Sequence, residues 1–199
     1  ASIAWTAGDA VRVEDLRLEE VDGDGLVRVS GIVAPFDQAD FDIDVRELPI
    51  GDLLDVAGVD FDLAGDLAVR GGIRATPAGP VMSLDVALDS GAIRGVQVRS
   101  IQAAVGYTDG ALTVDGTGAL GDSAFIELDG RIPARLTLGM PPSFALVEGG
   151  EIEARIATNR FPLATLDPGI RSVQDLEGLV RADVRIAGTM EAPRLVGNM

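Results

Sequence analysis

The stretch D-F-D-I-D-V-R at residues 40–46 sets the fold class, because charged and apolar residues alternate in it without a break. Successive side chains of a β-strand point to opposite faces, so this pattern places the apolar residues on one face and the charges on the other. A helix would need apolar residues at spacings of three and four instead. The stretch therefore predicts a β-strand with one dry face and one wet face.

The same alternation recurs in four further stretches, at residues 59–70, 84–88, 152–156 and 180–186. Helical spacing is nearly absent, and only residues 50–56 and 163–166 have the composition of short helical turns. We therefore expect an antiparallel, all-β chain whose dry face carries most of its large apolar side chains. The residues that we expect on that one face are Phe61, Leu63, Leu67, Val69, Leu84, Val86, Leu88, Ile152, Ile156, Val180, Val184 and Ile186.

Turns rich in Gly and Asp punctuate these strands at hairpin spacing. The predicted turns are residues 22–25, 89–91, 109–110, 121–123 and 148–150. A change of parity separates Val11 and Val13 from Leu16 and Leu18. If all four residues face the dry side, a β-bulge must lie at Glu14-Asp15.

Parts of the sequence repeat at fixed spacings. Leu48-Pro49-Ile50 resembles Phe161-Pro162-Leu163, and further identities follow at the same spacing of 113 residues. A second alignment, at a spacing of 87 residues, places Asp22-Gly23 on Asp109-Gly110. We expect two repeat units, at about residues 1–90 and 91–199, with one extra hairpin in the second unit. Stacked repeats of this kind are typical of an elongated architecture.

Composition excludes most catalytic chemistry. The 199 residues include 16 Arg but no Lys, His or Cys, and 32 carboxylates give a net charge of −16. Without His or Cys the chain has no Ser-His-Asp triad, thiolate nucleophile or ordinary zinc or haem site. Nucleic acid requires a basic face and is not an expected partner. We expect no cofactor and no enzymatic activity.

Three motifs suggest chemistry that their context does not support. Residues 116–121 match G-x-G-x-x-G, but a strand pattern follows where a nucleotide site needs a helix. Residues 20–31 begin like a calcium loop, yet Gly31 stands where the bidentate Glu is required. The paired carboxylates at Asp40, Asp42 and Asp44 alternate with apolar residues and so belong to a wet face. We interpret these motifs as a strand, a polar turn and a solvated surface.

Residues 184–197, V-R-I-A-G-T-M-E-A-P-R-L-V-G, resemble the repeating signature of the TamB family. This family, within the AsmA-like group, contains the inner-membrane-anchored subunit of the bacterial translocation and assembly module. A degenerate second copy lies at residues 63–80, with Ala75 where the family usually has Gly. Residues 107–114, Y-T-D-G-A-L-T-V, are similar to the family's recurrent strand pair. The resemblance covers nearly the whole chain.

The resemblance implies a long antiparallel sheet curled into a half-pipe, a β-taco or repeating β-groove, with an apolar interior. It implies a periplasmic location, with the full-length protein anchored in the inner membrane, and phospholipid transport between the two membranes. The implied partners are phospholipid acyl chains, neighbouring repeats of the same longer chain and an Omp85-type outer-membrane barrel that binds through regions absent here. The family has no catalytic residues to carry over.

The chain opens with Ala1 rather than Met and closes soon after a strand-like stretch, so we expect a piece of a longer protein. It contains no run of 18 apolar residues that would span a bilayer as a helix. Two other functions remain open for an all-β chain of this kind. One is a structural or adhesin-like β-sandwich with a closed core, and the other is a sugar-binding protein with acids and aromatic residues in one cleft.

Overall fold

A computed structural model describes residues 2–6, 10–20, 23–51, 63–93, 96–121, 124–138, 143–162 and 178–198. Its thirteen strands are β1 (Ser2–Thr6), β2 (Ala10–Glu19), β3 (Leu26–Ala34), β4 (Asp40–Pro49), β5 (Leu63–Thr76), β6 (Gly79–Ile93), β7 (Val96–Thr108), β8 (Ala111–Leu120), β9 (Ala124–Thr137), β10 (Ser143–Leu146), β11 (Glu151–Pro162), β12 (Leu179–Thr189) and β13 (Pro193–Asn198). The 3-10 helix η1 (Phe36–Gln38) joins β3 to β4. The described residues are therefore almost entirely β-strand, and the predicted all-β class is confirmed.

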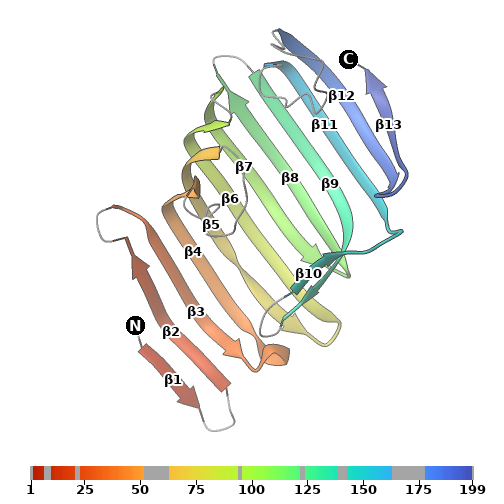
Figure 1. The fold of residues 1–199 in the computed structure, drawn as a ribbon. Coiled ribbons are helices and arrows are strands. Elements are labelled where there is room, and N and C mark those ends of the chain that lie inside the picture. Colours follow the sequence, from red (N-terminus) through yellow and green to blue (C-terminus); the bar gives the residue numbers. More distant parts are fainter. Residues whose placement is uncertain are drawn as a thin grey trace.

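The strands form one antiparallel sheet in which neighbours in sequence are neighbours in space (Figure 1). β10 is the exception, since it pairs only with the end of β9, and β11 follows β9 in the sheet. The sheet is curved and twisted, and its edge strands β1 and β13 do not meet. The predicted elongated, curved antiparallel sheet is confirmed.

The register of the strands separates apolar from charged residues. Residues that are opposite each other on neighbouring strands point to the same face. One such row crosses eleven strands through Leu18, Val27, Val45, Val69, Val86, Ala103, Gly116, Leu128, Ile156, Val184 and Gly197. The adjoining row on the other face runs through Arg17, Arg28, Asp44, Arg70, Asp85, Ala104, Asp115, Asp129, Arg155, Arg185 and Val196. We call these the apolar face and the charged face.

β-Bulges keep the apolar residues on one face where the sequence changes parity. In β2 the register shifts between Val13 and Leu16, so the bulge predicted at Glu14-Asp15 is confirmed. Further shifts lie in β4 after Val45, in β7 after Val98 and in β11 after Thr158. These three lie toward the same ends of their strands, where β4 and β11 finish and β7 begins, and we call this side of the sheet the bulge end. Bulges bend strands and increase their twist.

One predicted turn is wrong. Residues 89–91 do not connect two strands, because β6 continues through them to Ile93. Ser90, with a positive φ of 52°, and Gly91 instead form an irregularity within the paired strand. A short polar Ser-Gly sequence supplies the backbone freedom for a bulge as readily as for a turn. β6 ends at Ile93 and β7 begins at Val96, a few residues beyond the predicted turn. A separate turn at Pro77-Ala78, between β5 and β6, was not predicted by the turn pattern.

The described parts of the other predicted turns fall between strands, and residues 22, 122 and 123 lie outside the described residues. Asp109 and Gly110, both with positive φ, join β7 to β8, as expected for a tight hairpin. Residues 148–149 form a turn before β11, and Gly121 follows β8. At the end of β2, the Glu20 N–H donates to the Gly25 carbonyl at 2.9 Å. Ile50 and Gly51 are helical, whereas residues 52–56 and 163–166 lie outside the described residues.

The spacing of 113 residues corresponds to a structural repeat. Glu47 in β4 and Arg160 in β11 both have a positive φ, of 48° and 52°. Each comes just before the residue at which pairing resumes, Leu48 with Leu67 and Phe161 with Val180. The strand pairs β4–β5 and β11–β12 therefore share the same bulge and register. The spacing of 87 residues does not correspond to such a repeat. It relates β2 to β7, and these two strands run in opposite directions in the sheet.

Within the described residues, two groups of buried side chains lie toward opposite ends of the central strands. At the bulge end Leu88, Val98, Leu120 and Ala124 form a buried cluster, with Val98 only 2% exposed. At the opposite end Tyr107 is buried, and its hydroxyl donates to the Ala134 carbonyl at 3.2 Å. Between these clusters, in the part of the chain that the structure describes, no second layer covers the apolar face.

Candidate functional site

The structure brings eleven of the twelve predicted dry-face residues onto the apolar face. Leu67 lies opposite Leu88, and Val69 lies opposite Val86. On the other side of the sheet Ile156 lies opposite Val184. Phe61 lies outside the described residues. The other members of this set are Leu63 and Leu84 in β5 and β6, Ile152 in β11, and Val180 and Ile186 in β12.

This face is apolar but largely uncovered. Leu88 and Ile152 are 4% and 9% exposed, but Ile156 is 37% exposed, and the other described members of the set are half-buried. Outside the bulges, the register places no charged side chain on this face between β2 and β13 within the described residues. Large uncovered apolar surfaces on proteins mark interaction or ligand-binding sites.

The apolar face is hollowed over β8. Ile101, Leu120, Ile126, Leu128 and Phe161 surround a hollow of about 380 Å³. Gly116 and Gly118 also line it, and they leave the space that larger side chains would fill. The volume falls in the range of about 300–1,000 Å³ that is usual for small-molecule sites. Its lining offers hydrophobic contact and no ionisable group.

The two glycines belong to the G-x-G-x-x-G motif at residues 116–121. The motif lies within and just after β8, as its strand pattern predicted, and no helix follows it in the described residues. What sequence reasoning missed is that Gly116 and Gly118 face the same side as the large apolar residues of β7 and β9. Their spacing of two residues was the available signal, because glycines two apart in a strand share a face.

Ion pairs cover the charged face. The Arg46 guanidinium donates to both carboxylate oxygens of Asp44, and that of Arg155 donates to both oxygens of Asp183 at 2.9 and 2.7 Å. These hydrogen bonds hold the pKa of Asp44 and of Asp183 below the ordinary value of 3.8. Asp40 and Asp42 are exposed, which agrees with the prediction that the carboxylates of this strand face solvent.

The charged face carries a hollow of its own, of about 740 Å³. Small residues of neighbouring strands, including Ala68, Ala87 and Ala104, line it together with Asp44 and Arg70. A simple half-pipe would be hollow on one face only. The twist of this sheet makes it concave along one diagonal on each side.

A pH titration tests the ion pair between Asp183 and Arg155. A carboxyl whose pKa is lowered by folding adds stability above its unfolded pKa, and this stability is lost as pH falls through the folded pKa. The melting temperature of Asp183→Asn should therefore lie below that of the wild type from neutral pH to about pH 4, and the difference should vanish in stronger acid. Asp42→Asn, at an exposed carboxylate, should match the wild type throughout. Equal melting of Asp183→Asn and wild type at pH 7 would contradict the assignment.

The described residues show no group of three or more carboxylate, His or Cys side chains placed to hold a metal ion. Within that same part of the chain, no helix is both long enough and apolar enough to cross a bilayer. No family model, curated protein or solved structure matches the chain. The functional assignment therefore rests on the faces of the sheet.

Proposed function

We propose that the apolar face binds the acyl chains of phospholipids, and that the chain forms one segment of a periplasmic protein that conducts lipid between the inner and outer membranes. The observation that carries this proposal is the charge-free, half-exposed apolar face with its hollow over β8. The chain acts here as a binding surface and not as an enzyme.

Acyl chains fit this face for a physical reason. Burial of apolar area stabilises a contact by about 25 cal/mol per Å², without requiring directional bonds. The register gives a row across eleven strands that carries no charged side chain at any of them. A charged side chain in this row would lose its hydration whenever a hydrocarbon chain lay over it, and this desolvation costs free energy. A path for lipid chains therefore requires a face without charged side chains, as this face is.

The resemblance of residues 184–197 to the TamB signature supports the same function. In this proposal, neighbouring repeats of the longer protein continue the face on either side, and an Omp85-type partner docks elsewhere on that protein. The sandwich alternative needs a second sheet over the apolar face. The described residues form a single layer there, so no observation favours that alternative.

Photo-crosslinking tests the proposal at adjacent positions of β6. Leu84 lies on the apolar face, and its neighbour Asp85 lies on the charged face. A photoreactive residue at position 84 should yield phospholipid adducts in bacteria, detected by mass spectrometry, and the same residue at position 85 should not. Equal labelling at both positions, or no lipid at either, would contradict the proposal.

The melting of Leu84→Asp adds a second measurement. On an open face the new carboxylate stays in contact with water, so the melting temperature should fall only modestly. In a closed core the same charge would be buried without a partner and would unfold the domain. Collapse of the fold in this variant would therefore support a covered core.

A further inference from the structure

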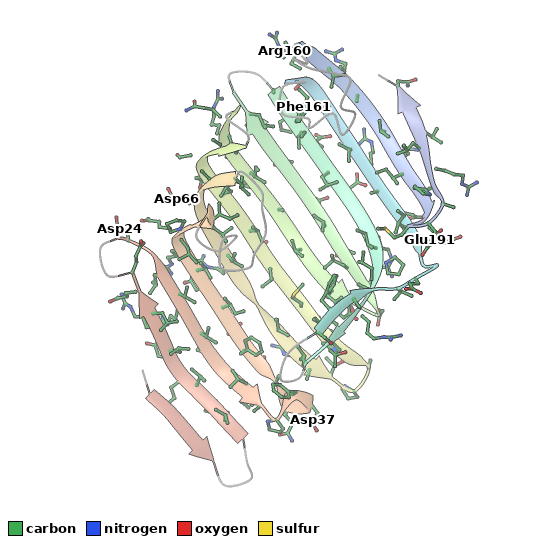
Figure 2. All side chains as sticks on the ribbon, in the orientation of Figure 1. Asp24, Asp37, Asp66, Arg160, Phe161 and Glu191 are labelled. Carbon is green, nitrogen blue, oxygen red and sulfur yellow. The ribbon has the colours of Figure 1, made fainter. Side chains whose placement is uncertain are left out.

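Two arginines lie at the bulge end of the sheet, on either side of the hollow. Arg99 occupies the bulge of β7, between Val98 and Ser100. Arg160 occupies the bulge of β11, with a φ of 52°, immediately before Phe161, which lines the hollow. Figure 2 shows Arg160 and Phe161 at the same end of the sheet.

Hydrogen bonds connect these two positions to the strands under the hollow. The Arg99 guanidinium donates to the Gly121 carbonyl at 2.9 Å, directly after Leu120 of β8. Next to Arg160, the Asn159 Oδ1 accepts from the Phe125 N–H of β9 at 2.8 Å. The backbones of β7 and β11 lie about 14 Å apart, with β8 and β9 between them. The Arg99 side chain spans part of that distance.

Both guanidinium groups are available to a ligand. Arg99 and Arg160 are exposed, and neither has a carboxylate of the described residues within ion-pair distance. By contrast, Arg46, Arg74 and Arg155 of the charged face are each paired with an aspartate. Eight of the fourteen described arginines lack an ion pair with a described carboxylate, so Arg99 and Arg160 are distinguished by their place beside the apolar hollow.

We propose that Arg99 and Arg160 bind the phosphate of a phospholipid whose acyl chain occupies the hollow over Gly116 and Gly118. This inference rests on the proposed function and adds a head-group site to it. An amphiphile lying in a charge-free hollow must place its polar group at the rim. The guanidinium group matches phosphate geometry through two parallel hydrogen bonds. Arg160 directly precedes Phe161, and Arg99 is hydrogen-bonded directly after Leu120, so both arginines lie next to residues that line the hollow.

Binding of two pyrene-labelled lipids tests the head-group site in the purified chain. The probes are phosphatidylethanolamine and a diacylglycerol with the same labelled chain but no phosphate. Arg99→Gln/Arg160→Gln should weaken phosphatidylethanolamine binding about tenfold and leave diacylglycerol binding unchanged. Arg185→Gln/Arg194→Gln removes the same charge from the charged face and should change neither affinity. Arg99→Lys/Arg160→Lys should retain part of the lost affinity.

The outcomes separate this inference from the function on which it rests. If both lipids bind and the Gln variant binds them as the wild type does, the head-group site is wrong and the acyl-chain function stands. If neither lipid binds the wild type, both proposals are wrong. If inorganic phosphate alone binds with the same dependence on the two arginines, the site is a free-anion site and the lipid head-group assignment is overturned. Circular dichroism of each variant shows whether it is folded.

Discussion

Gly118→Leu is expected to abolish acyl-chain binding and leave the sheet folded. Gly118 lies on the floor of the hollow, with an ordinary strand backbone. A Cβ at this position would lie 3.5 Å from Ile101 Cγ1 and 3.6 Å from Ile126 Cγ2, which are normal contact distances. The remaining atoms of leucine would extend into the hollow, where the acyl chain would otherwise lie. The fold gains apolar contact while the ligand loses its space.

The measurement is binding of the pyrene-labelled lipids, for which we expect a loss of tenfold or more. Each tenfold corresponds to about 1.4 kcal/mol, less than the burial of a few methylene groups contributes. Ala119→Leu, one residue away on the charged face and outside the lining of the hollow, is the matched control and should bind lipid normally. Undiminished binding by Gly118→Leu would show that acyl chains lie elsewhere.

Gly31→Ala is expected to destabilise the protein by about 3 kcal/mol or more. Gly31 in β3 has a φ of 128°, a backbone conformation that residues with a Cβ rarely adopt. A Cβ there would overlap the Asp40 carbonyl oxygen and approach the Phe41 Cα to 2.6 Å. Both are backbone atoms of the adjacent strand, so the collision can be relieved only by moving β4.

Urea unfolding measures this loss, and Gly118→Ala is the control because it adds the same methyl group where there is room. The control should be neutral or stabilising by up to about 1 kcal/mol, since Gly weakens a strand relative to Ala. Equal unfolding midpoints for the two variants would contradict the inference that β3 and β4 lie too close together at Gly31 to admit a Cβ.

Alternation in the sequence predicted the two faces because a strand has only two sides. The parity change between Val13 and Leu16 even located the bulge of β2, since only an extra residue keeps both on one face. The eleven described dry-face residues follow from the same rule. For the same reason the carboxylates of β4 could be assigned to the solvent side.

Curvature and the hollow could not be predicted in this way. Alternation says which face a residue occupies but not how far the sheet bends. The bend depends on bulges such as those at Ser90 and Arg160, and the residues 89–91 resemble a turn in the sequence. The hollow depends on Gly116 and Gly118 coinciding with large residues on three neighbouring strands. That coincidence is a matter of register, which a single sequence does not specify.

Consecutive pairing of the strands has a consequence for how such a sheet lengthens over evolutionary time. The strand pairs β4–β5 and β11–β12 lie six places apart in the sheet, so they run in the same direction and share the same bulge. Inserting an even number of strands keeps the two pairs running in the same direction, whereas an odd number would make them run in opposite directions. β2 and β7, five places apart, run in opposite directions for this reason. Duplicating a hairpin would therefore extend the sheet by about 10 Å without disturbing either face. The protein can thus be matched to a longer span by whole hairpins.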